Sequence, residues 1–75
     1  MPHYVVDVKG MLCPMPVIRL GEQARQLTVG DTIELMATDP GVDADIPAWC
    51  RVHGHRILER QADGEVITFI VEIGE

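Results

Sequence analysis

The chain has 75 residues, a formal net charge of −6 and a hydrophobic fraction of 47%. This length predicts a single domain over residues 1–75, with no room for separate substrate and cofactor domains. The hydrophobic fraction is too high for a disordered chain, and the acidic charge disfavours direct binding to a nucleic-acid backbone.

The cysteines and the N-terminal segment indicate a cytoplasmic protein whose thiols stay reduced. Cys13 and Cys50 are far apart in sequence, whereas small secreted domains carry denser cysteine frameworks. Residues 1–4 lack the basic and apolar regions of a signal peptide. No apolar run reaches the roughly 18 residues that span a bilayer, so we expect no membrane association.

Apolar periodicity predicts a strand over residues 4–8 and a helix from Pro14 to near Leu27. Proline suits the first helical position because its missing N–H has no intrahelical acceptor there. The prediction places Cys13 at the N-cap of this helix. The apolar face of the helix consists of Val17, Leu20, Ala24 and Leu27.

A second strand and a second helix are predicted over residues 32–37 and about 43–53. Asp43 is the expected N-cap, and Pro47 is tolerable only in or beside the first turn. The strand is expected to turn Ile33, Leu35 and Ala37 toward the core. The inner face of the helix is expected to carry Ile46, Trp49, Cys50 and His53.

Residues 55–61 and 65–73 alternate around Asp63-Gly64, which is a strong hairpin signal. The order β-α-β-α-β-β predicts an α/β two-layer sandwich, a mixed four-stranded sheet with both helices on one face. The last strand turns Ile67, Phe69, Val71 and Ile73 to one side. The uncovered sheet face is expected to be of mixed polarity and to include Thr32, Glu34, Met36, Arg60, Thr68, Ile70 and Glu72.

Cys13 is the candidate functional residue. A thiol reacts as its thiolate, and the exposed N–H groups and positive dipole of a helix start favour that form. Pro14 and Pro16 restrict the backbone on its C-terminal side. The alternative is a small buried hydrophobe that closes the helix start, and position alone does not decide between the two.

Other machinery of thiol enzymes is missing from the sequence. There is no Cys-x-x-Cys and no recognisable phosphate loop or cofactor motif. No feature places His3, His53 or His55 beside Cys13. We therefore expect no cofactor and no metal site, because structural zinc sites normally show paired cysteine spacings. A lone thiol suits group transfer with a partner better than turnover on a small molecule.

The run Gly10-Met11-Leu12-Cys13-Pro14-Met15-Pro16 resembles the G-x-x-C-P-x-P signature of the TusA/SirA family of small sulfur-carrier proteins. Asp39-Pro40 and the later Asp45-Ile46-Pro47-Ala48-Trp49-Cys50 resemble the second segment of its TusA-type members. The resemblance extends over essentially the whole chain. It implies a mixed four-stranded sheet with two helices on one side, and a persulfide-carrying thiol at Cys13.

The resemblance also implies partners and a pathway. The donor would be a cysteine desulfurase or a rhodanese-like protein, and the acceptor a downstream sulfur-relay protein in tRNA 2-thiouridine synthesis. Related members serve molybdenum-cofactor synthesis or sulfur oxidation. Such a protein is a persulfide sulfurtransferase or carrier rather than a stand-alone turnover enzyme, and we expect a monomer. Two alternatives stay open: a non-catalytic regulatory or interaction module of the same fold, and a redox subunit with a Cys13–Cys50 disulfide.

Several residues around Cys13 have supporting roles in this interpretation. Gly10, Pro14 and Pro16 are expected to shape the thiol loop and the helix start. Asp39 should lie at the same sheet edge as Cys13 because its strand runs parallel to the first. It is a candidate for the rim of the site, with an ordinary Asp-Pro-Gly turn as the alternative.

Three further residues are weighed against ordinary structural roles. Arg19 lies one turn after Cys13 and is a candidate partner contact or a plain solvated charge. Cys50 is predicted to be a buried structural thiol rather than a second sulfur site. Asp45 is predicted to be a first-turn helix carboxylate rather than a catalyst.

Overall fold

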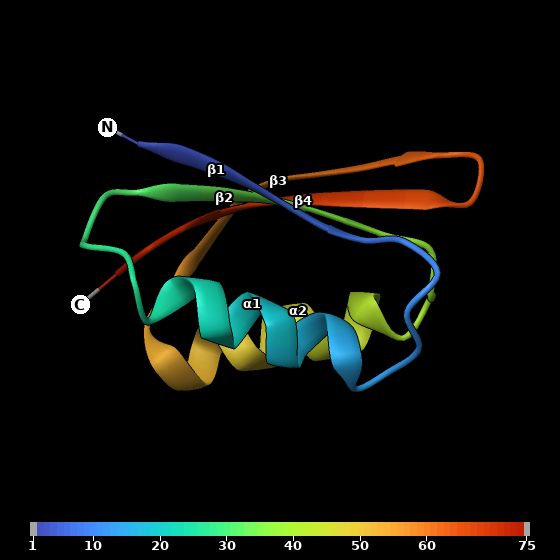
Figure 1. Ribbon diagram of the computed structural model, residues 1–75, viewed down its shortest axis with the longest axis horizontal. Coiled ribbons are helices and arrows are strands. Elements are labelled where there is room, and N and C mark those ends of the chain that lie inside the picture. Colours follow the sequence, from blue (N-terminus) through green and yellow to red (C-terminus); the bar gives the residue numbers. More distant parts are fainter. Residues whose placement is uncertain (1, 75) are drawn as a thin grey trace.

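The computed structural model describes residues 2–74 and consists of a four-stranded sheet with two helices on one of its faces (Figure 1). Within these residues no helix is long and apolar enough to cross a membrane. The predicted order and the α/β sandwich are confirmed. The elements are β1 (His3–Val8), α1 (Met15–Ala24), β2 (Thr32–Ala37), α2 (Val42–His53), β3 (Arg56–Asp63) and β4 (Val66–Glu72).

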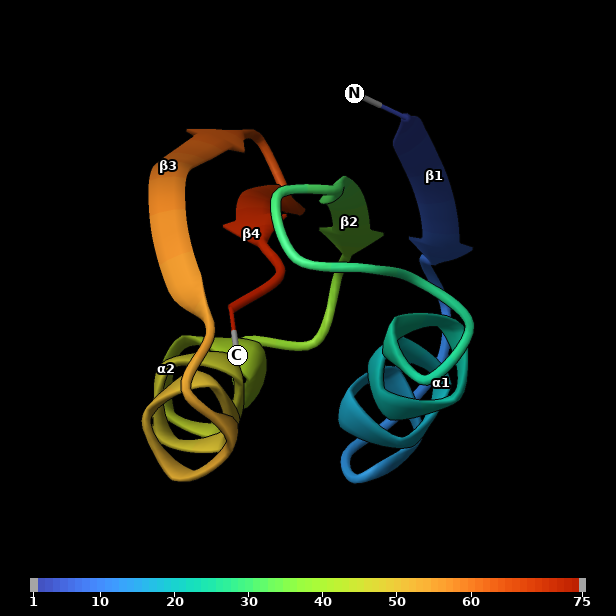
Figure 2. The same cartoon turned by 90° about the vertical axis from the view of Figure 1, so that its left-hand side faces the viewer.

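The strands lie in the order β1-β2-β4-β3. β1 and β2 are parallel, whereas β4 is antiparallel to both of its neighbours, β2 and β3. Figure 2 shows α1 beneath the β1 side of the sheet and α2 beneath the β3 side. Because β1 and β2 are parallel, the loops that follow them leave from the same end of the sheet.

Alternation along β2 and β4 builds the core. The side chains of these strands that face the helices are buried, as predicted, and they are Ile33, Leu35, Ala37, Ile67, Phe69 and Val71. The helices contribute Leu20, Val42, Ile46 and Cys50 to the same cluster. Burying one aliphatic side chain of this size contributes about 1.5–3 kcal/mol.

Helix α1 begins one residue later than predicted and ends earlier. Pro14 is the N-cap, so Cys13 lies outside the helix and the predicted N-cap position is wrong. The reason is a turn in which the Met15 N–H donates to the Leu12 carbonyl at 2.9 Å. At the other end, the N–H of Leu27 bonds back only three residues, to Ala24. Such bonds tighten the last turn out of α-helical geometry.

Helix α2 begins earlier than predicted, with Gly41 rather than Asp43 at the N-cap. The helix starts early because the Val42 N–H already bonds to the Asp39 carbonyl at 3.2 Å. Pro47 therefore lies inside the helix, beyond the first turn in which it was expected. A proline there removes the N–H that would bond four residues back, to the Asp43 carbonyl.

Strand β3 changes face at an irregularity between Ile57 and Glu59. A residue added to one strand reverses the side-chain alternation beyond it. Arg60 consequently pairs in register with Phe69, whose side chain is in the core, and binds Asp43 of α2 at 2.8 Å. The prediction that Arg60 lies on the uncovered face is therefore wrong.

Candidate functional site

Two loops meet at the end of the sheet where β1 and β2 finish, and Cys13 lies in the first of them (Figure 1). Gly10 begins this loop with a φ of +82°, a conformation that glycine adopts without steric cost. Its N–H donates to Thr38 Oγ1 in the second loop at 2.9 Å. Gly10 thus sets the direction in which the chain leaves β1.

Asp39 ties the two loops together with one carboxylate. Its Oδ2 accepts the backbone N–H of Cys13 at 2.6 Å, and its Oδ1 accepts the N–H of Gly41 at 3.0 Å. The hydrogen bonds from Gly41 and Cys13 lower the pKa of the Asp39 carboxyl because they favour its charged form. The expectation that Asp39 lies beside Cys13 is confirmed. The backbone that carries the thiol is therefore anchored from the second loop.

The thiol of Cys13 contacts a second carboxylate, which lies on another element. Cys13 Sγ donates to Asp45 Oδ2 at 2.5 Å. Asp45 occupies the first turn of α2, as predicted, but its contact with the thiol was not predicted. The two residues are 32 positions apart, and only the packing of the α2 N-terminus against the thiol loop brings them together.

The carboxylates raise the pKa of the Cys13 thiol above its ordinary value. The largest cause is the hydrogen bond to Asp45, followed by partial desolvation and by the negative charges of Asp45 and Asp39. The expectation that the helix start favours the thiolate is therefore wrong for the free protein. The thiol precedes the N-cap instead of occupying it, and two nearby negative charges oppose its ionisation.

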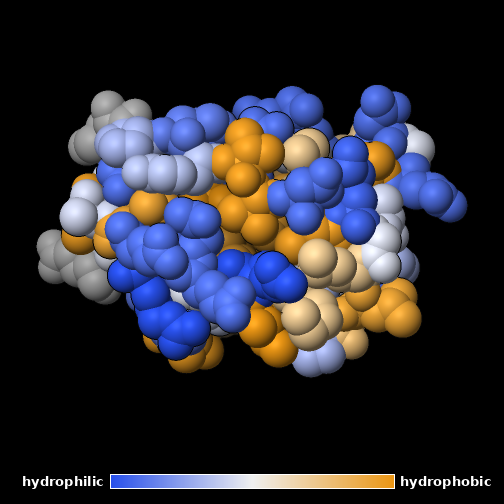
Figure 3. All heavy atoms as spheres, in the orientation of Figure 1, coloured by the Kyte–Doolittle hydropathy of each residue, from blue (hydrophilic) through white to orange (hydrophobic). Residues whose placement is uncertain are grey.

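Exposed apolar side chains follow or precede Cys13 in the thiol loop and at the start of α1. Cys13 is itself exposed, which rules out the buried hydrophobe as an interpretation. Leu12, Met15 and Ile18 are 74%, 38% and 44% exposed, respectively. Figure 3 shows hydrophobic surface at this end of the molecule, where α1 begins. Pro16 is buried in the first turn of α1, so the thiol lies beside an apolar surface on a well-packed helix start.

Arg19 does not join this arrangement. Its side chain pairs with Glu22, one turn further along α1, at 3.9 Å, and both groups are about half exposed. A pair of this kind contributes little to stability. Arg19 also lines a hollow beside β1 together with Val8 and Met11.

Cys50 is a core residue. It is 3% exposed and lies among the buried side chains of the core cluster, which confirms its predicted burial. Burial raises the pKa of its thiol to about 11. Both cysteines are free thiols.

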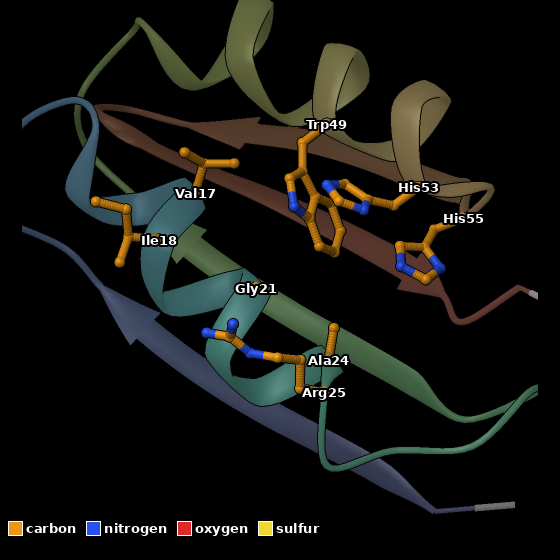
Figure 4. Close-up of a pocket in the computed structure, with 8 residues that line it drawn as sticks. All are labelled: Val17, Ile18, Gly21, Ala24, Arg25, Trp49, His53 and His55. Atoms are coloured by element: carbon orange, nitrogen blue, oxygen red, sulfur yellow. The ribbon is translucent and has the colours of Figure 1, made fainter.

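A groove of about 560 Å³ runs between α1 and α2 (Figure 4). Trp49 and His53 were expected on the core face of α2, and both line this groove. Trp49 is partly buried and packs against the core as expected, whereas the His53 side chain is exposed, so the prediction is wrong for His53. Ile46 and Cys50 occupy the side of α2 that meets the sheet, which leaves Trp49 facing α1. The Trp49 ring centroid lies 5.1 Å from that of His53 and 4.8 Å from that of His55.

Comparisons with known proteins agree with this fold and with the family that the sequence resembles. The crystal structure of a SirA-like protein from Desulfitobacterium hafniense superposes with a TM-score of 0.84 over 96% of this chain and 99% of that one, at 23% identity. That likeness shows the fold.

Sequence comparison gives relatives with higher identity to this chain than that structure has. The chain is 37% identical over 70 residues to the putative sulfur carrier proteins YrkI and YrkF of Bacillus subtilis, covering 93% of YrkI but only 38% of YrkF. It is 40% identical over 62 residues to the sulfur carrier protein TusA of Pseudomonas putida strain GB-1, covering 83% of this chain and 78% of that protein. Residues 4–73 match the family described as Sulfurtransferase TusA. The chain therefore belongs to the TusA family of sulfur carrier proteins.

Proposed function

We propose that the protein carries sulfane sulfur as a persulfide on Cys13, receiving it from one protein and passing it to another. The observation that carries this proposal is the placement of the thiol. Cys13 is exposed at the junction of two loops, its backbone is anchored by Asp39, and apolar side chains flank it. An exposed apolar surface beside a reactive group suits transient contact with a protein partner.

The transfer exchanges one persulfide for another. The Cys13 thiolate attacks the outer sulfur of the donor persulfide, and the S–S bond of the donor breaks with its electron pair leaving on the donor thiolate. In the second half, the acceptor thiolate attacks the outer sulfur on Cys13 in the same way. Neither step changes the overall oxidation state, so no external oxidant or cofactor is required.

For the donor we propose a cysteine desulfurase or a rhodanese-like protein, and for the acceptor a downstream sulfur-relay protein. The pathway proposed is tRNA 2-thiouridine synthesis in the cytoplasm, with the chain acting as a monomer. The net charge of −6 supports a carrier that leaves the tRNA to a later enzyme, because acidic surfaces repel phosphate backbones.

The proposal is tested by incubating the protein with a purified bacterial cysteine desulfurase, pyridoxal phosphate and cysteine, and then measuring its intact mass. We expect a gain of about 32 Da, one sulfur atom, that a reductant removes. Cys13→Ser should abolish the gain, and Cys50→Ser, as the matched control, should retain it. No gain on the wild-type protein would contradict the carrier function. A loss of about 2 Da that requires both cysteines would instead support the redox alternative.

A further inference from the structure

The Asp45 side chain restrains the Cys13 thiol from a different element. Asp45 belongs to α2, whereas Cys13 lies in the loop before α1, and the Sγ–Oδ2 contact of 2.5 Å joins the two. Asp39, in the loop after β2, holds the backbone of Cys13 rather than its sulfur. The two carboxylates therefore have separate roles: Asp39 holds the backbone of Cys13, and Asp45 accepts the hydrogen bond of its sulfur.

The charged groups that act on the Cys13 sulfur are both acidic. Asp45 from α2 and Asp39 from the preceding loop raise the pKa of this thiol, and within residues 2–74 no cation contributes a counteracting effect. α1, the helix that follows Cys13, carries its basic side chain Arg19 in a pair with Glu22. A thiol in these surroundings has a small thiolate fraction at neutral pH, although solvent reaches it freely.

We propose that Asp45 is a positioning residue for sulfur transfer. Its carboxylate keeps the Cys13 thiol hydrogen-bonded and protonated in the free carrier, and the thiol becomes a nucleophile when a docked sulfur donor breaks that bond. This inference rests on the proposed persulfide function. In this scheme the exposed thiol reacts slowly with soluble electrophiles and still reacts with its partner.

The proton balances in this scheme. Cys13 Sγ loses its proton as the bond to the outer sulfur of the donor forms, and the donor sulfur takes up a proton as its S–S bond breaks. The net reaction converts a thiol and a persulfide into a persulfide and a thiol, with no electron gained or lost. Asp45 changes which protonation state of Cys13 is populated, and it forms no covalent bond to sulfur.

The first experiment measures the rate of Cys13 alkylation by iodoacetamide from pH 6 to pH 10, with peptide mapping to separate Cys13 from Cys50. Asp45→Asn should shift the profile to lower pH and raise the rate at pH 7 by about threefold or more, since the rate follows the thiolate fraction. Asp43→Asn is the matched control, because Asp43 lies in the same first turn but binds Arg60. Asp45→Glu should keep part of the restraint.

The second experiment compares two sulfur donors by the rate of the 32 Da gain on Cys13. With glutathione persulfide, which does not dock as a protein, Asp45→Asn should load faster than wild type by the same factor as in alkylation. With the cysteine desulfurase, the variant should load within about twofold of wild type, because docking has already broken the bond. Circular dichroism on each variant confirms that it is folded.

Each outcome bears on one part of the scheme. Coincident alkylation profiles for wild type, Asp45→Asn and Asp43→Asn, all folded, would overturn the role of Asp45. If Asp45→Asn loads sulfur faster than wild type by the same factor with both donors, then docking of the desulfurase does not break the hydrogen bond between Cys13 and Asp45. If wild type takes no sulfur from the desulfurase, the carrier function fails, while the alkylation profile still reports on Asp45 independently.

Discussion

Both cysteines carry thiols with raised pKa values, but the main physical cause differs between them. Cys13 is exposed, and the carboxylates of Asp45 and Asp39 oppose its ionisation. Cys50 is buried in the core, and desolvation alone raises the pKa of its thiol to about 11. The first restraint comes from side chains on the surface that another molecule can displace, whereas the second comes from packing that only unfolding removes.

This difference separates the proposed sulfur-carrying thiol from the buried thiol more clearly than the direction of the pKa shift does. A carboxylate that accepts a hydrogen bond at the surface can exchange it for water or for a partner group. A thiol packed among apolar side chains has no such exchange, since opening the core costs much of the stability of a small domain. Access, and not acidity, therefore distinguishes Cys13.

The largest effect expected from this contrast is in native reactivity. With iodoacetamide at pH 8, Cys13 should react more than about 100-fold faster than Cys50, whose thiolate fraction at a pKa of about 11 is about one in a thousand. Peptide mapping by mass spectrometry gives both rates in one sample. In 6 M guanidinium chloride the two rates should converge. Comparable rates in the native protein would contradict the buried position of Cys50.

Stability should show the reverse ranking of the two positions. Cys50→Ser places a hydroxyl in the core without a designed partner, and we expect the free energy of unfolding to fall by about 1–3 kcal/mol. Cys13→Ser should leave the urea midpoint unchanged, because that side chain is exposed. Equal midpoints for the two serine variants would show that Cys50 is not packed as the structure has it.

A smaller effect is expected from Asp39, which should contribute to the stability of the folded protein in a pH-dependent way. The pKa of Asp39 is lowered in the folded protein, so its stabilising contribution is present above the unfolded pKa near 3.9 and is lost as pH falls through the lowered value. Asp39→Asn should lower the thermal midpoint at pH 7 and flatten its decline between about pH 5 and 3. Asp63→Asn, in the β3–β4 hairpin, is the control for charge removal. An unaltered acid decline in Asp39→Asn would contradict the anchoring role.

The smallest effect concerns the end of α2 beyond Cys50. Desolvation, and secondarily the charge of His53, lowers the pKa of His55, so the folded state disfavours its protonation. Stability is then full above the unfolded pKa near 6.5 and falls as pH drops below it. His53→Gln should reduce the loss of thermal midpoint between pH 7.5 and 5.5, and His3→Gln in β1 should not. If the thermal midpoint of His53→Gln falls more than that of wild type over this pH range, then His53 does not lower the pKa of His55.

The sequence by itself determined the order of the elements and the core faces of β2 and β4. Alternation along residues 32–37 and 65–73 identified the buried side of β2 and β4 because side chains in a strand repeat every two residues. The parallel crossover placed Asp39 beside Cys13 because parallel strands end at the same edge. The motif around Cys13 indicated the family before any contact was known. Local periodicity and chain direction suffice for such statements.

Only the tertiary structure decided what surrounds the thiol. The contact between Cys13 and Asp45 joins residues 32 positions apart on different elements. This contact raises the pKa of the Cys13 thiol, whereas its predicted place at a helix start favoured the thiolate. The turn before α1 moved Cys13 out of the N-cap, and the irregularity in β3 brought Arg60 to Asp43 on the helix side. Such features depend on how α2 and the thiol loop pack against one another, and a periodic pattern along the chain carries no information about that packing.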